Sequence, residues 1–191
     1  MGAAKDILHQ ALRENRDGLV AKFDALPEFD LRRPLTPTGT NLLGLVKHLA
    51  GIEYGYLGDS FGRPPARPLP WDADGSVWDN ADMWATPEES SDFILGLYSE
   101  ACAHSDLTIA DLDLDASGRV PWWDEGRADT TLGTLLVRVL VDTVRHAGQA
   151  DVVRELIDGR GGVDHDQQGD QEWWTGYVAR VAAAAAAFEE P

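Results

Sequence analysis

Three side chains of this sequence have the types and the spacing of a metal site. Asp142 and His146 are four residues apart, so on a helix their side chains leave the same face one turn apart. This spacing lets one helix give two ligands to one metal ion. His48 is the best third candidate, because its neighbours Leu45 and Ile52 belong to the apolar stripe of another predicted helix. A set of two histidines and one carboxylate is typical of catalytic sites, where a fourth position stays open for water or substrate.

The segment around Asp142 also breaks the apolar pattern of its own helix. Its inward seam steps by four and three residues through Leu135, Val139, Asp142, His146, Gln149 and Val153. An unpaired charge on a buried seam costs several kcal/mol, so these polar side chains require partners or a polar pocket. A purely structural alternative stays open, in which His48 hydrogen-bonds a backbone carbonyl. Asp142 would then pair with one of its neighbours, namely His146, Arg138 or Arg145.

Further candidates for binding a substrate lie on either side of this seam. Trp122 and Trp123 precede the helix and are candidate substrate-binding residues, although such residues more often fill a core. Arg145 and Arg154 are candidates to meet carboxylates of a cofactor or substrate, and surface ion pairing is their alternative role.

The hydrophobic periodicity predicts the helices that position these residues. We expect helices over about 5–25, from a Thr40 cap to Gly58, from Thr86 past Ala101, from about 131 to Gly159, and from Asp170 to Phe188. Irregular stretches over 62–85 and 111–131 connect them, and no segment predicts a strand. The sequence therefore predicts an all-α four-helix bundle, a single domain over 1–191, with a long crossover and an additional C-terminal helix. Packing at a shallow angle would bring the seams of the second and fourth helices within reach of each other.

Composition narrows the classes of partner. The 191 residues include 16 Lys or Arg and 33 Asp or Glu, a formal net charge of −17. Such a chain repels phosphate backbones and anionic lipid, so we expect neither a nucleic-acid nor a membrane partner. The single cysteine, Cys102, forms no internal disulfide and, with no visible signal peptide, favours a cytoplasmic location. The alanine run 182–187 and seven tryptophans predict self-association, most simply as a homodimer.

Four separated motifs resemble the DinB-like superfamily, and more narrowly its actinobacterial, mycothiol-dependent branch of maleylpyruvate isomerase-like proteins. They are GLVKHLAGIE at 44–53, ADMW at 81–84, VPWW at 120–123, and RHAGQAD with ELIDG over 145–159. The resemblance implies a DinB-like bundle and a divalent metal, zinc or nickel, held by His48, Asp142 and His146. In that branch the middle ligand resembles glutamate, and relatives have histidine where this chain has Arg138 and Gln149.

The resemblance also implies an activity. It suggests a metal-dependent S-transferase or isomerase that activates a small-molecule thiol, such as mycothiol, for reaction with an electrophile. In that mechanism no protein nucleophile is required. The alternative is a non-catalytic metal-binding or stress-response bundle, in which the polar cluster only fixes the helix register.

Overall fold

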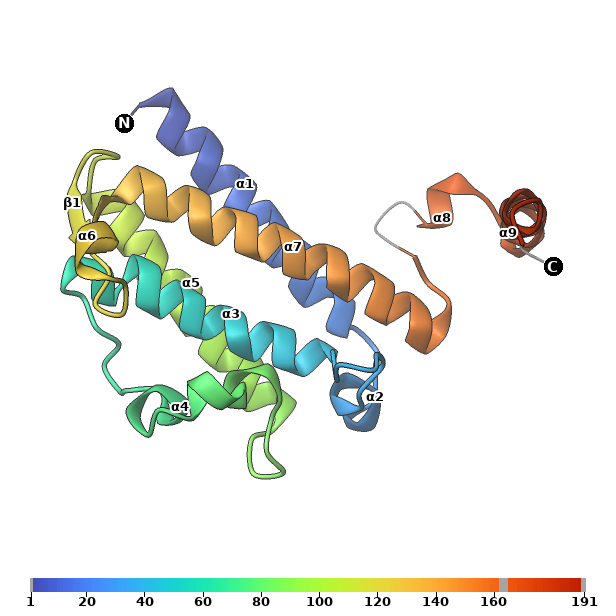
Figure 1. The fold of residues 1–191 in the computed structure, drawn as a ribbon, viewed down its shortest axis with the longest axis horizontal. Coiled ribbons are helices and arrows are strands. Elements are labelled where there is room, and N and C mark those ends of the chain that lie inside the picture. Colours follow the sequence, from blue (N-terminus) through green and yellow to red (C-terminus); the bar gives the residue numbers. More distant parts are fainter. Residues whose placement is uncertain (1, 162–164, 190–191) are drawn as a thin grey trace.

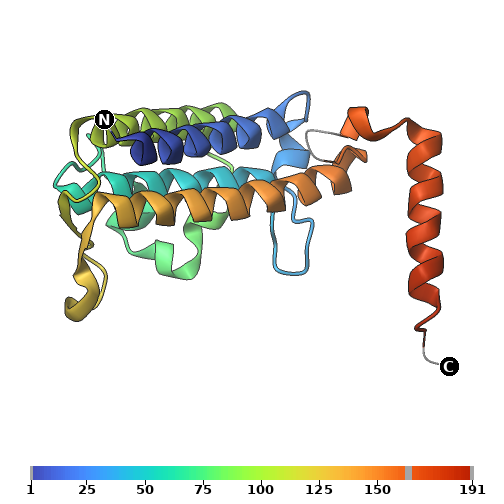
Figure 2. The same ribbon diagram turned by 90° about the horizontal axis from the view of Figure 1, so that it is seen from above.

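Four long helices lie side by side in the computed structural model, which describes residues 2–161 and 165–189 (Figures 1 and 2). They are α1 (Ala3–Val20), α3 (Leu42–Leu57), α5 (Ser91–Asp111) and α7 (Leu132–Asp158). Helix α3 makes its most extensive contacts with α5 and α7, and α1 packs on α7. The predicted all-α bundle is confirmed, and α3 and α7, which bear the candidate ligands, are direct neighbours.

Apolar side chains from all four helices fill the interior. One buried cluster lies mainly between α3 and α5 and includes Leu45, Leu49, Ile94, Tyr98 and Val153. A second cluster lies toward the start of α7 and includes Leu12, Leu57, Ile109, Leu135 and Val139. The inward seam of α7 is therefore apolar on both sides of its polar section, as the periodicity predicts.

The ends of α3 and α7 follow from their capping residues. The Asn41 side chain accepts a hydrogen bond from the Gly44 amide at 2.7 Å and starts α3, one residue later than the expected Thr40 cap. The Thr131 hydroxyl caps α7, and Gly159 ends it in the left-handed conformation (φ +78°) that favours glycine. Both predicted limits of α7 are confirmed.

The start of the third long helix was predicted wrongly. Helix α5 begins at Ser91, where the Ser90 hydroxyl accepts from the Phe93 amide, and not at Thr86. The Glu89 carboxylate instead accepts from the Thr86 amide and from Lys47 of α3. This closes residues 86–89 into a turn against α3, so the real cap comes four residues later.

The connecting segments contain short elements that the sequence did not predict. The crossover over 62–85 folds into α4 (Pro70–Ala73), η3 (Ser76–Asp79) and η4 (Ala81–Met83). Strands β1 (Ser117–Arg119) and β2 (Asp129–Thr131) pair antiparallel before α7, contrary to the expectation of no strand. Three-residue strands show no periodicity from which they could be predicted. The other short elements are η1 (Ala21–Phe23), α2 (Glu28–Arg32), η2 (Asp59–Phe61), α6 (Glu125–Ala128) and α8 (His165–Gln168).

The additional C-terminal helix, α9 (Gln171–Ala186), stands away from the bundle (Figures 1 and 2). It is seen end-on in Figure 1, and in Figure 2 it runs across the direction of the four long helices. None of its residues is buried, and Tyr177, Val181 and Phe188 of its predicted apolar face are exposed. The expectation of one domain over 1–191 stays a prediction. Within the described ranges, no helix is both long and apolar enough to cross a membrane.

Candidate metal centre

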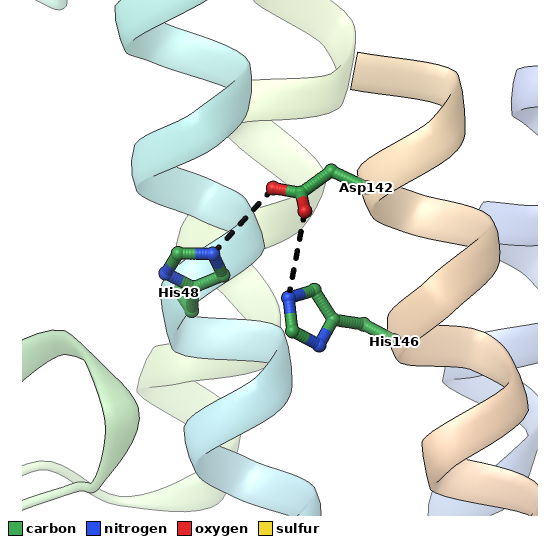
Figure 3. A group of neighbouring side chains, drawn as sticks. All are labelled: His48, Asp142 and His146. Carbon is green, nitrogen blue, oxygen red and sulfur yellow. Dashed lines mark ion pairs between the residues drawn. The ribbon is translucent and has the colours of Figure 1, made fainter. Parts of the chain in front are cut away.

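The three predicted ligands meet between α3 and α7. Figure 3 shows His48 pointing from α3 toward Asp142 and His146, which project from successive turns of α7. One Asp142 oxygen lies 3.6 Å from His48 Nε2, and the other lies 3.8 Å from His146 Nε2. One ligand atom from each residue can be chosen so that all lie within 4.8 Å of one another. Helix packing thus brings together the residues that the seam pattern selected.

The other ring nitrogen of each histidine is held by a second polar side chain. His48 Nδ1–H donates to the Asp82 carboxylate at 2.6 Å, and His146 Nδ1–H donates to Gln149 Oε1 at 2.7 Å. When such a histidine is neutral, it presents the lone pair of Nε2, as is usual for histidines that bind metal. Both imidazoles therefore turn their ligand atoms toward the Asp142 carboxylate.

Asp82 contacts the candidate ligand His48 and was not among the predicted site residues. It belongs to η4 in the crossover, and its side chain is only 10% exposed. The Lys47 ammonium anchors this segment to α3 by donating to the Ala81 and Trp84 carbonyls at 2.9 and 3.0 Å. The sequence signal of Asp82 is the ADMW motif at 81–84, one of the four motifs that carry the resemblance.

The charges of the cluster favour different protonation states for its two histidines. Burial alone would lower the pKa of His48, but hydrogen bonds and attraction from Asp142 and Asp82 outweigh it and raise that pKa to about 9. Burial and repulsion by His48 lower the pKa of His146. The hydrogen bond with His48 lowers the pKa of Asp142 despite partial burial, so its carboxylate is ionised at neutral pH.

The geometry agrees with the structural alternative in part. Asp142 pairs with His146, as that alternative allows, and also with His48, whereas no ion pair with an arginine is found for it among the described residues. The guanidinium of Arg138 lies over the rings of Tyr56 and Trp123, at 4.9 and 5.0 Å. Arg145 is exposed. His48 bonds a carboxylate rather than the backbone carbonyl expected in that alternative.

A cavity of about 350 Å³ opens beside the cluster, and His48 and Asp82 line it. The cavity wall includes Trp122, which was predicted to bind substrate, but neither Trp123 nor Arg145. Arg154 lies elsewhere: it pairs with Asp158 and donates to the carbonyls of residues 22 and 24, which matches its structural alternative. Of the predicted substrate-binding residues, Trp122 alone lies on this wall.

Comparison with known proteins adds a family and a fold. The sequence model of the family described as mycothiol-S-transferase matches residues 7–159, which is most of the chain and all four long helices except the first residues of α1. No curated protein sequence matches. One similar solved structure is that of a conserved protein of Enterococcus faecalis, with a TM-score of 0.63 and 13% identity. The similarity covers 84% of this chain and 100% of the other and shows the shared fold.

Proposed function

The chain belongs to the mycothiol-S-transferase family, and from this premise we propose that it is a metal-dependent enzyme that activates a low-molecular-weight thiol. Mycothiol is the thiol that the family description indicates. The reaction would join the thiol sulfur to an electrophilic atom of a second small molecule. An isomerisation, in which the sulfur adds to the substrate and later leaves, uses the same activated thiol.

One observation carries this proposal: two histidine Nε2 atoms and one carboxylate converge, and both histidines are held by a second polar group. This donor set fits a divalent cation such as zinc or nickel, because both ions bind nitrogen and oxygen ligands in the same site. His48, Asp142 and His146 would hold the cation. When bound, it stabilises a thiolate at neutral pH.

The remaining residues of the site would orient the metal ligands and bind the second substrate. Asp82 and Gln149 fix the tautomers and ring orientations of the two histidines. The cavity wall next to His48, including Trp122, would receive the electrophile. The one cysteine of the chain does not replace the cofactor thiol, because Cys102 lies on α5 and burial raises its pKa to about 12.

A comparison of the wild type with the triple variant His48→Ala, Asp142→Ala, His146→Ala tests this function. We expect zinc- or nickel-loaded wild type to accelerate conjugation of mycothiol with an electrophile, and we expect the variant to bind no metal and be inactive while it stays folded. Loss of metal together with a collapse of the melting temperature would favour the non-catalytic, structural alternative. If the wild type conjugates none of a panel of electrophiles and binds no thiol, the proposal is wrong.

We propose in addition that the protein is cytoplasmic and forms a homodimer. The location rests on the single cysteine, Cys102, which forms no internal disulfide. The dimer is supported by exposed apolar side chains on the outer face of α7 and on α9.

A further inference from the structure

The cavity beside His48 is walled by aromatic side chains from separate segments of the chain. Trp71 and Trp78 come from the crossover, Tyr56 from α3 and Trp122 from the loop after β1. Trp78 is 76% exposed and Trp122 is 40% exposed, so both indoles stand at the mouth. Exposed indoles at a concave site offer flat apolar surfaces for stacking.

Glycines of α3 make room for this wall. A Cβ atom at Gly55 would lie 2.9 Å from the ring of Trp122, closer than real Cβ contacts. Glycine therefore allows the indole to lie directly against the helix backbone. Gly51, one turn earlier, also lines the cavity. The cavity therefore lies between α3, the crossover and the Trp122 indole.

Apart from His48, the residues of the cavity wall that carry a charge near neutral pH are all carboxylates. They are Asp59, Asp72 and Asp82, and no lysine or arginine lines the cavity among the residues that the structure describes. Asp82 is engaged with His48, whereas Asp59 and Asp72 have no such partner among the ion pairs found. Burial and repulsion from Asp59 and Asp82 raise the pKa of Asp72 to about 6, so it is still mostly ionised above pH 7.

The nearest cations are turned to other partners. Lys47 lies over the Trp71 ring at 4.3 Å, but its ammonium is bonded to two carbonyls and to Glu89. Arg138 lies over Tyr56 and Trp123. A carboxylate entering the cavity would thus approach Asp59 and Asp72. The one cationic group described on the wall, His48, is already paired with Asp82 and Asp142.

We propose that this cavity selects planar aromatic electrophiles that are uncharged or cationic and discriminates against anionic ones. This inference rests on the proposed thiol transfer and specifies the class of its second substrate. The discrimination comes from Asp59 and Asp72, and the affinity comes from stacking on Trp78 and Trp122.

A matched pair of chloroarenes tests the selectivity. With 2-chloro-1,3-dinitrobenzene or 4-chloro-3,5-dinitrobenzoate, the thiolate sulfur forms a bond to the ring carbon, and chloride leaves with the electrons of the C–Cl bond. The two substrates differ mainly by one carboxylate. After division by the uncatalysed rates, we expect kcat/KM for the neutral compound to exceed that for the anion by about tenfold, since two nearby charges oppose the anion.

Charge-neutral variants locate the source of the preference. In Asp59→Asn, Asp72→Asn we expect the preference to fall by about fivefold, mainly through faster reaction of the anion. The double variant Asp113→Asn, Asp115→Asn is the control, because it removes the same charge from an exposed loop outside the cavity and should keep the wild-type preference. Equal preference in the wild type and the Asp59/Asp72 variant would overturn the proposal.

A binding measurement separates this inference from the proposed function. Tryptophan fluorescence quenching by unreactive 1,3-dinitrobenzene and 3,5-dinitrobenzoate needs neither thiol nor turnover. Tighter binding of the neutral compound, weakened by Trp78→Ala, without any thiol conjugation would support the cavity assignment and refute the transferase. Conjugation that is equally fast or faster with the anion would support the transferase and refute the proposed selectivity.

Discussion

Asp142 gives one carboxylate oxygen to each histidine of the cluster, and this position makes it the most informative residue to change. Asp142→Asn keeps the volume and removes the charge, so we expect metal affinity to fall by at least about tenfold. The metal-free protein should lose less than about 1 kcal/mol, because Asp142 is partly exposed and His48 keeps Asp82 as a partner. Metal analysis, together with melting in chelator and in excess zinc, checks both expectations.

Glu155→Gln is a matched control, since it removes an exposed carboxylate from the same helix and should leave metal content unchanged. If Asp142 instead compensated a buried cation, the Asn variant would lose about 3–5 kcal/mol with or without metal. Equal destabilisation in chelator and in zinc, with unchanged metal occupancy, would show that Asp142 is not a ligand.

The protonation of His48 predicts a proton released on metal binding. Its pKa of about 9 in the metal-free protein leaves it protonated at pH 7.5, whereas His146, whose pKa is lowered, is already neutral. A ligand nitrogen must be unprotonated, so about one proton should leave per metal bound at pH 7.5. Affinity should therefore rise with pH until it levels off near pH 9. Calorimetry in buffers of different ionisation enthalpy measures the proton count.

Asp82→Asn supplies the control for this measurement. It removes one of the two charges that hold the proton on His48, so fewer protons should be released at the same pH. Zero release by the wild type at pH 7.5 would contradict a role for His48 as a ligand.

The sequence predicts some of these residue-level contacts and not others. Asp142 and His146 share a helix, so their spacing alone places them together, and His48 follows from the seam of the neighbouring helix. Asp82 lies 34 positions from His48 in an aperiodic segment, and only the folded crossover places it on the ring. Gln149 was recognised on the seam, but its hydrogen bond with His146 needs the observed rotamers.

At the scale of elements, the contact between α3 and η4 holds Asp82 against His48, so we expect it to control the proposed metal centre. A Cβ atom at Gly44 would overlap the Met83 carbonyl, so the crossover can approach α3 only over a glycine. We expect Gly44→Ala to push η4 away, to destabilise the fold by about 2 kcal/mol or more, and to weaken metal binding without touching a ligand. Melting temperature and metal titration of the variant measure the two effects.

Gly96→Ala on α5 is the control, because nothing lies within 4 Å of a Cβ atom there. It should be neutral or stabilise the protein by up to about 1 kcal/mol, as alanine does inside a helix. If Gly44→Ala proved as stable and bound metal as well as Gly96→Ala, the close approach of η4 would not hold Asp82 in place.

The long helices could be predicted because their apolar residues repeat every three or four positions, and Thr131 and Gly159 mark the ends of α7 unambiguously. The start of α5 was predicted wrongly, because the prediction used Thr86 as the cap, although Ser90 is also of a residue type that caps helices. Glu89 decides between them through a bond from Lys47, a residue 42 positions away. Contacts of this kind between distant residues are invisible to local patterns.

At the scale of the whole molecule, exposed apolar side chains of the described residues gather on the outer face of α7 and on α9. The outer face of α7 exposes Val137, Val141, Val144 and Val152 by 44–57%, opposite its buried seam. Helix α9 adds an aromatic group in which Trp173 stacks on Tyr177 with ring centroids 5.3 Å apart. The family match ends at residue 159, so α9 lies outside the part of the chain that the family shares. A second copy is the partner that we proposed for these surfaces.

If the outer face of α7 forms the homodimer interface, substitutions on that face should change the mass of the protein in solution. Wild-type protein at micromolar concentration should sediment at about twice the chain mass of 20.8 kDa. Val141→Lys, Val144→Lys places two charges on the outer face without touching the core, so it should yield monomer with an unchanged melting transition at low concentration. Leu107→Lys on α5 replaces a similarly exposed apolar residue away from α7 and should remain dimeric. A single species near 20.8 kDa for the wild type would refute the dimer. A Val141/Val144 variant that stays dimeric would show that the interface lies elsewhere, and α9 would be the next surface to test.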